Sequence, residues 1–199
     1  MISFIKKIFF YTSLILLISS NSNSAETNAE AFVLKFTEDT KIIFNDESLN
    51  KDSRLKKINE LSAKYLDLDA LAVYTLGDYR EKVSAAEKDN FSKLFREYFI
   101  KNMSSKLNDY ADQELKILGS KRINENNIIV STKIFSKKDA QEIAVDWRIY
   151  IKDSKLLVRD LVVEGLSLAR TQKEEFASII GSKGFAGVIS ALENYNKSN

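Results

Sequence analysis

The stretch "VVEGLSLARTQKEEF", residues 162–176, joins a strand pattern to a helix pattern. The two valines are typical of a β-strand, and a helix-like run begins within ten residues of them. Gly165 lies where the patterns meet, and a glycine inside a strand pattern indicates a bulge or a bend. We therefore expect the strand to continue through Gly165 into residues 166–170 and the sheet to curl there. "TQKE" then predicts a helix start, because Thr171 and Glu174 match a capping box.

Upstream of this junction the apolar residues recur with period two, which predicts further strands. The cleanest is "EIAVDWRIYI", residues 142–151, because every second side chain from Ile143 onward is apolar. The other candidate strands are "ELKIL" (114–118), "NIIVSTKIF" (127–135) and "LLVRDLVVEG" (156–165). Turn-like "SKKDAQ" and "KDSK" separate the last three strands, so neighbours should pair as antiparallel hairpins.

The first half of the chain has helical periodicity. Apolar spacing predicts helices over residues 29–44 and 53–65. A short helix follows, for which Asp67 or Asp69 is the expected cap and Gly77 the stop. "SAAE", residues 84–87, is a second capping box. The aromatic-rich stripe after it comprises Phe91, Phe95, Tyr98, Phe99 and Met103.

Helices also follow the candidate strands. Phe176, Ile179 and Ile180 lie on one helix, which Gly181 and Gly184 should end, before a last amphipathic helix over residues 185–195. Helices around an antiparallel sheet predict the α+β class. We expect one domain, residues 26–199, with a curved sheet of about four strands. N-terminal and C-terminal helices should cover the sheet and enclose an apolar cavity. Periodicity leaves open whether side chains or a ligand fill that space.

Residues 1–25 match a cleavable export signal. Lys6 and Lys7 precede an apolar run of 11 residues, Ile8–Ile18, which is too short to span a bilayer comfortably. Small polar residues follow, and the chain has no Cys that could be acylated. We therefore expect the mature protein to be exported. The candidate cleavage positions follow Ser22, Ser24 and Ala25.

The composition excludes several kinds of chemistry. The 199 residues include no Cys and no His, which excludes thiol nucleophiles, disulfides, Cys or His metal sites and histidine acid–base catalysis. Removal of the signal lowers Lys+Arg from 30 to 28 against 28 Asp+Glu, so the net charge becomes about zero. A neutral chain is poorly suited to nucleic acid, where phosphate neutralisation supplies most of the affinity. We expect no metal, no cofactor and no nucleic-acid partner.

Two blocks and a strand carry a resemblance to a known family. The blocks are "DLVVEGLSLARTQKEEFASIIGSKGFAGVISAL" (160–192) and "YLDLDALAVYTLGDYREKVSAAEKDNFSKLFREYF" (65–99), and the strand is "VDWRIY" (145–150). They resemble the MlaC-like periplasmic phospholipid-binding proteins, also called toluene-tolerance proteins. The matching residues of the first block are Glu164, Gly165, Ser167, Thr171, Phe176, Gly184, Phe185 and Gly187. Those of the second are Leu71, Leu76, Gly77, Tyr79, Ser84, Phe91, Phe95, Arg96 and Glu97.

The resemblance implies a soluble, monomeric carrier that shuttles phospholipid across the bacterial periplasm. Its implied partners are an outer-membrane lipoprotein–porin complex and an inner-membrane ABC transporter with an MCE component, and its implied role is to maintain outer-membrane lipid asymmetry. In this family the acyl chains lie between the curved sheet and the helices. Family members often carry a tryptophan soon after the leucine–glycine pair, where this chain has Tyr79 and Arg80.

Burial of two acyl chains requires a deep apolar lining. At about 0.8 kcal/mol per methylene, two chains of about fourteen methylenes need about 20 kcal/mol of protection from water. We expect the lining to comprise Val73, Leu76, Phe95, Phe99, Val145, Trp147, Val163, Leu166 and Phe176. For each of them ordinary core packing is the alternative. A head group could emerge beside Tyr79 and Arg80, for which a solvated loop is the alternative.

Two other functions make different predictions for this sequence. An enzyme would use Asp146 or Asp160 as a general base, but Asp146 alternates away from the apolar face and no second catalytic group is evident. We therefore expect no enzyme, and we expect Glu164 to stabilise the bulge or to face a partner. A periplasmic chaperone or adaptor would bind protein segments through an apolar groove. It should show a long unpaired edge strand or an exposed helix groove.

Overall fold

The computed structural model describes residues 20–107, 113–135 and 142–198. The predicted apolar run of the export signal and the predicted "SKKDAQ" turn lie outside these residues. The helices are α1 (Ser20–Phe44), α2 (Lys51–Tyr65), α3 (Leu68–Thr75), the 3-10 helix η1 (Gly77–Glu81), α4 (Ala85–Leu107) and α5 (Leu168–Ser198). The strands are β1 (Glu114–Asn124), β2 (Asn127–Phe135), β3 (Glu142–Lys152), β4 (Lys155–Val163) and β5 (Leu166–Ser167).

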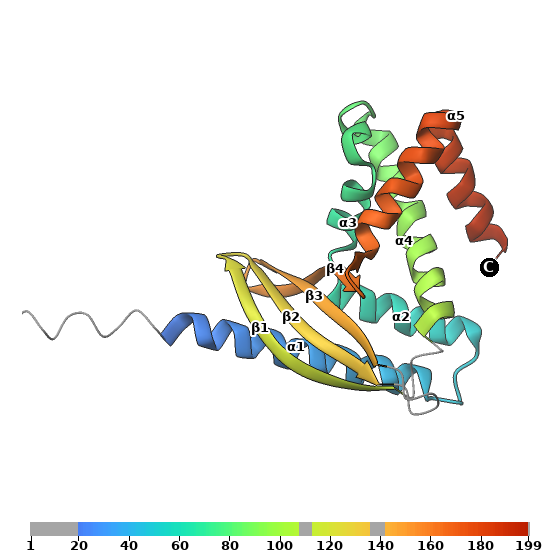
Figure 1. Cartoon of the computed structure of the whole chain (residues 1–199). Helices are drawn as coiled ribbons and strands as arrows, with labels where there is room; N and C mark the ends of the chain where they lie inside the picture. The colour runs from blue at the N-terminus through green and yellow to red at the C-terminus, as the bar shows by residue number, and fades with distance from the viewer. Residues whose placement is uncertain (1–19, 108–112, 136–141, 199) are drawn as a thin grey trace, which may run out of the picture.

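The strands form one antiparallel sheet in the order β1-β2-β3-β4-β5. Every strand pairs with its neighbour in the sequence, as the turn signals predicted. The sheet curves around α1, while α3, α4 and α5 stand together on the other side of α2 (Figure 1). The α+β prediction with a curved antiparallel sheet is therefore confirmed, with five strands in place of about four.

The turn at Glu164 and Gly165 explains the fifth strand. Both residues have positive φ, 48° and 81°, and Val163 pairs directly with Leu166. This is a two-residue hairpin loop, in which positive φ at both positions matches the twist of the strands. The predicted continuous strand through Gly165 is therefore wrong, because the chain reverses there. As expected, Glu164 stabilises this region: its side chain accepts the N–H of Ala144, and its own N–H donates to the Ala144 carbonyl at 2.9 Å.

The hairpin also moves the start of the last helix. Ser167 is the residue that caps α5, because its Oγ accepts the N–H of Arg170 at 3.1 Å. The predicted capping box is wrong, since Thr171 donates to the Ser167 carbonyl and Glu174 pairs with Arg170. Within α5 only Gly184 leaves helical geometry, with φ 69°. The helix turns back on itself (Figure 1).

Other helix ends follow the local sequence signals. The predicted capping box at Ser84 is confirmed, because its N–H donates to Glu87 at 2.8 Å and its Oγ accepts the Glu87 N–H at 3.2 Å. Hydrogen bonds from the hydroxyl and the N–H of Ser84 lower the pKa of Glu87. Asp67, one of the two expected caps, accepts the Ala70 N–H at the start of α3. No helix in the described part of the chain is both long and apolar enough to cross a bilayer.

The buried apolar residues form two clusters. We call the first the sheet cluster, since it fills the space between the inner face of the sheet and helices α1 and α2. Phe36 stacks on Tyr65 at 4.8 Å and meets Trp147 edge-on at 5.6 Å between ring centroids. Its members are Ala29, Val33, Phe36, Ile43, Phe44, Ile58, Leu61, Tyr65, Ile100, Ile128, Val130, Val145, Trp147, Ile149 and Val158.

The second group, which we call the helical cluster, joins α3, α4 and α5. Aromatic rings dominate it: Phe91 lies 5.9 Å from Phe95, 5.7 Å from Phe176 and 6.2 Å from Phe185 between ring centroids. Its members are Ala72, Leu76, Val83, Phe91, Phe95, Phe176, Val188 and Leu192. Helix α4 spans both clusters, because it also supplies Ile100 to the sheet cluster.

Strand β4 holds the starts of two helices of the helical cluster. At the start of α3, the backbone N–H of Asp67 donates to the Val158 carbonyl at 3.1 Å. At the start of α5, Asp160 accepts the Ser167 hydroxyl at 2.6 Å and the Ala169 N–H at 3.0 Å. We call the boundary between the two clusters, at these joints, the seam.

Candidate functional site

The nine residues expected to line a cavity divide between the two clusters. Val145 and Trp147 belong to the sheet cluster, and Val163 packs against it half-buried. Leu76, Phe95 and Phe176 belong to the helical cluster, and Phe99 packs against it. The remaining two, Val73 and Leu166, are exposed. The structure therefore does not bring the nine around a single hollow, and their role as a lipid lining stays a prediction.

One row of side chains connects the surface to the interior. The strand register places Leu166 opposite Val163, Val163 opposite Val145, and Val145 opposite Thr132. Directly paired residues share one face of a sheet, so the four follow one another on the inner face. Leu166 is 57% exposed, whereas Val145 is 3% and Thr132 is 1% exposed. We call this set the Leu166 row, because it begins at that exposed leucine and ends in the core.

The polar atoms at the inner end of this row are satisfied. The Thr132 hydroxyl donates to the Val145 carbonyl at 2.9 Å and accepts the indole N–H of Trp147 at 3.1 Å. A buried hydroxyl or indole without a partner would favour a polar ligand, because its desolvation would be uncompensated. With both groups paired inside the protein, the surface offered at this point is apolar.

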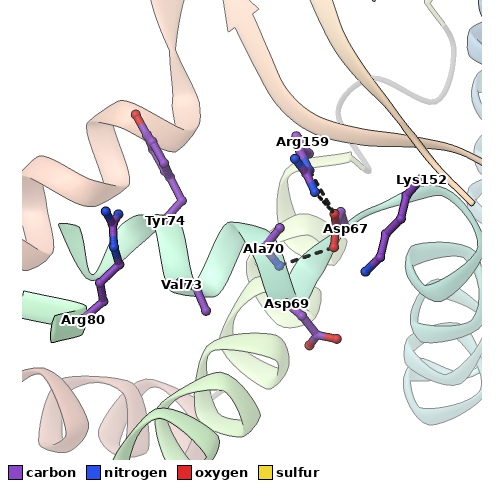
Figure 2. Close-up of a pocket in the computed structure, with 8 residues that line it drawn as sticks. All are labelled: Asp67, Asp69, Ala70, Val73, Tyr74, Arg80, Lys152 and Arg159. Carbon is purple, nitrogen blue, oxygen red and sulfur yellow. Dashed lines mark hydrogen bonds and ion pairs between the residues drawn. The ribbon is translucent and has the colours of Figure 1, made fainter. Parts of the chain in front are cut away.

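A surface pocket opens between α3 and the β3–β4 hairpin, with a volume of about 470 Å³. Figure 2 shows its lining, which comprises Asp67, Asp69, Ala70, Val73, Tyr74, Arg80, Lys152 and Arg159. Of the nine expected lining residues, only Val73 contributes to it. Five of its eight residues are charged, while the surface that the pocket exposes is mostly apolar, so charged groups and apolar surface lie in one pocket.

An ion pair forms one wall of this α3 pocket. The Arg159 guanidinium donates to Asp67 Oδ2 through Nε at 2.9 Å, and its Nη2 lies 2.8 Å from the same oxygen. The same guanidinium lies over the Tyr150 ring, 3.3 Å from its centroid. Arg159 reaches α3 because the register shift opposite Arg148 leaves it as an extra residue in β4. Such a bulge re-aims a side chain, here towards the seam.

Asp160, the neighbour of Arg159, holds the start of α5 on β4. It is buried, and it accepts the two hydrogen bonds from the start of α5 while Arg148 lies 3.4 Å away. These contacts engage both carboxylate oxygens, so Asp160 acts as a structural anchor of α5. Asp146, the other candidate base, lies in β3 on the face opposite Val145 and Trp147. The described residues contain no group of three or more acidic side chains that could hold a metal ion.

The second pocket, of about 290 Å³, lies between α1 and α2. Its central acid is Asp39, which accepts from the Tyr65 hydroxyl at 2.6 Å and pairs with Lys35 and Lys64, each at 2.9 Å. Partial desolvation would raise the pKa of Asp39, but the hydrogen bonds from Tyr65, Lys35 and Lys64 hold it well below its usual range. These charges are used to hold α1 on α2.

Sequence reasoning missed six of the eight residues of the α3 pocket, among them the charged Asp67, Lys152 and Arg159. One signal was present in the sequence. Arg159 and Asp160 are two consecutive charges inside an otherwise apolar strand pattern, and a strict alternation would place only one of them outside. That conflict indicates a bulge at this position. Tyr79, expected at a head-group exit, instead stacks on Phe185 at 5.8 Å.

Comparison with known proteins places this geometry in a family. The family model described as MlaC protein matches residues 35–194. The intermembrane phospholipid transport system binding protein MlaC of Haemophilus influenzae is 24% identical over 132 residues, which cover 65% of this chain. The match spans 62% of that relative, less than two thirds of its length.

A solved structure shares the fold. The phospholipid-binding protein from Ralstonia solanacearum, in complex with a phospholipid, superposes with a TM-score of 0.70 at 19% identity. The superposition covers 84% of this chain and 96% of that one. Because the family model matches most of the sequence, from the middle of α1 to the end of α5, the chain belongs to the MlaC protein family.

Proposed function

We propose that this protein binds a phospholipid and carries it across the periplasm. The observation that carries the proposal is the Leu166 row, because it joins an exposed leucine to a buried apolar face without a polar interruption. Membership of the MlaC family supports it, as do the names of the two similar proteins, which state phospholipid transport and phospholipid binding.

The tails need a larger space than either pocket offers. At about 0.8 kcal/mol per methylene, two chains of about fourteen methylenes need about 20 kcal/mol of protection. The α3 pocket is open to solvent, so it cannot supply that burial. In our proposal the acyl chains lie between the sheet cluster and the helical cluster. The seam opens for them, and Leu166 and Val163 are the first contacts on the way in.

The finer proposal concerns the pathway of the lipid. The mature protein would be exported after cleavage at Ser22, Ser24 or Ala25, and would act as a monomer without catalysis. It would exchange phospholipid with an inner-membrane ABC transporter that carries an MCE component and with an outer-membrane lipoprotein–porin complex. This exchange would help to maintain outer-membrane asymmetry. The phrase "intermembrane phospholipid transport system" in the name of the Haemophilus relative supports this assignment.

A chaperone or adaptor is the second candidate, favoured by strand β1. This edge strand has 11 residues, and its Leu118 and Ile123 are exposed. An exposed edge can add a strand from another chain. However, Glu26 of α1 already accepts the N–H of Arg122 at 2.7 Å, and Glu30 accepts the Ser120 hydroxyl at 2.5 Å. Helix α1 therefore blocks part of that edge.

Native mass spectrometry separates the two candidates. The full-length gene would be expressed in a bacterium with two membranes, and the protein would be purified from the periplasm without detergent. We expect a complex whose added mass equals one or more phospholipids, with the same lipid recovered by solvent extraction. A bare protein with no extractable lipid would overturn the carrier proposal. Suppression of aggregation of an unfolded client protein by that bare form would favour the chaperone.

A further inference from the structure

The α3 pocket lies at the seam and carries more positive than negative groups. Its cations are Arg80, Lys152 and Arg159, and its acids are Asp67 and Asp69. Its floor includes the apolar side chains of Ala70 and Val73 on α3 (Figure 2). A volume of about 470 Å³ lies within the range of small-ligand sites. It is therefore large enough for a phospholipid head group whose tails pass into the seam.

Both acids of the pocket are already engaged. Asp67 accepts from Arg159 and from the Ala70 N–H. Asp69 accepts from Arg96 at 2.7 Å. An ammonium group would compete with Arg159 for Asp67 and would otherwise meet only Asp69, which is exposed and already pairs with Arg96. Because three cations line the same pocket, it suits an anion better than a cation.

The cations are less engaged. No ion pair joins Lys152 to another residue in the part of the chain that the structure describes, and Arg80 pairs only with its exposed neighbour Glu81 at 3.2 Å. Arg159 donates one of its five N–H groups to Asp67, through Nε, and its guanidinium lies over the Tyr150 ring. A guanidinium with donors to spare, in a pocket that two further cations also line, is suited to phosphate oxygens.

We propose that this pocket binds the phosphate of a phospholipid head group and favours lipids of net negative charge over zwitterionic ones. The inference rests on the proposed function, which it extends from phospholipids in general to a head-group class. Lys152 and Arg80 supply the attraction, and the Asp67–Arg159 pair forms the rigid wall. The amine of a zwitterionic lipid would meet three cations and only carboxylates that already pair with arginines, so it gains less there than an anionic lipid does.

The expected size of the preference follows from exposure. Lys152 and Arg80 are exposed, so each contributes as a surface charge does, and salt screens both. Two such contacts correspond to an affinity about fivefold higher for an anionic phospholipid than for a zwitterionic one. The preference should shrink towards unity when the salt concentration rises from 0.05 M to 0.5 M, since the Debye length falls well below the pocket dimensions.

The test is a competition for the lipid-free protein between phosphatidylglycerol and phosphatidylethanolamine with the same acyl chains, read by native mass spectrometry. The variants are Lys152→Gln, Arg80→Gln and their double mutant, and Lys121→Gln on β1 is the control for loss of one exposed charge. We expect the wild type and the control to favour phosphatidylglycerol about fivefold. The double mutant should bind both lipids equally, because its affinity for phosphatidylglycerol falls to that for phosphatidylethanolamine.

Each other outcome has a distinct meaning. Equal binding by the wild type, or a preference that survives in the double mutant, would overturn the head-group assignment and leave lipid carriage intact. No binding of either lipid would overturn the proposed function and this inference with it. A further arm tests millimolar inorganic phosphate with the lipid-free protein. If phosphate binds and this binding is lost in the double mutant, the pocket is a site for free phosphate. That result would overturn the head-group assignment.

Discussion

The sheet cluster and the helical cluster hold their apolar residues by different means. Three long strand pairings run through the sheet, and each fixes its register over eight or more residue pairs. The helical cluster has no strand within it, and stacked or edge-on rings centred on Phe91 join its helices. Backbone ladders resist separation along their whole length, whereas packed side chains can part at one surface. This difference supports our proposal that the molecule opens at the seam.

The largest expected effect tests the helical cluster. Phe91 is fully buried, so Phe91→Ala should lower the free energy of unfolding by about 3–5 kcal/mol. Because its partners lie in α4 and α5, hydrogen exchange should quicken in those helices and stay slow in β2 and β3. Ile149→Val in the sheet cluster is the reference and should cost about 0.5–1.5 kcal/mol. Equal loss of amide protection in both clusters would contradict the division into two.

The second prediction concerns the joint at α5. Asp160→Ala removes the acceptor of the Ser167 hydroxyl and the Ala169 N–H, and should lower stability by about 2 kcal/mol in urea denaturation. Asp146→Ala in β3 is the matched control and should change stability by less than about 0.5 kcal/mol. If the two variants are equally stable, Asp160 is no anchor of α5.

The third prediction addresses the Leu166 row. Leu166→Asp places a charge where an acyl chain would enter, so lipid affinity should fall at least about tenfold, or about 1.4 kcal/mol. Leu118→Asp is the control, because Leu118 is also a strand leucine and is 54% exposed against 57% for Leu166. Displacement of a bound fluorescent phospholipid measures both. Similar affinities for the two variants would count against entry at Leu166.

The smallest effect depends on pH and tests how α1 is held on α2. The pKa of Asp39 is lowered in the folded state, so its ionised carboxylate adds stability above the unfolded pKa of about 3.9. That stability is lost as the pH falls through the folded pKa. The lysine partners are half-exposed, so Asp39→Asn should cost only about 1 kcal/mol at pH 7. In denaturant titrations, the difference in the free energy of unfolding between wild type and Asp39→Asn should become smaller below pH 4. A difference that does not change with pH would show that the ionised carboxylate is not its cause.

Local patterns predicted most of the fold. The run "NIIVSTKIF" has the bounds of β2, and the capping box at Ser84 begins α4 as expected. The prediction failed at Glu164, where a glutamate takes a positive φ usually reserved for Asn, Asp or Gly. The pairing of β5 with β4 stabilises that conformation. Such pairing is a tertiary interaction, so it could not be predicted from the local sequence around Glu164.

The site was less predictable than the fold. Periodicity identified Phe95, Phe176, Val145 and Trp147 as inward-facing, and all four are buried. It could not tell that Phe95 and Phe176 belong to the helical cluster while the other two belong to the sheet cluster. Periodicity indicates which side chains are buried, but it does not indicate which residues they pack against. The charged α3 pocket depends on the bulge at Arg159 and on a contact with Asp67 that spans 92 positions, which single-chain spacing does not encode.

The packing of α1 has a consequence for the order in which the protein matures. Val33 and Phe36 are covered by the sheet, and Glu30 reaches Ser120, 90 positions later. Because synthesis proceeds from the N-terminus, the apolar face of α1 stays exposed to solvent until β1, β2 and β3 have been made. Helix α1 is synthesised before the strands that cover its apolar face. During synthesis it is therefore the segment most exposed to chaperone binding or aggregation.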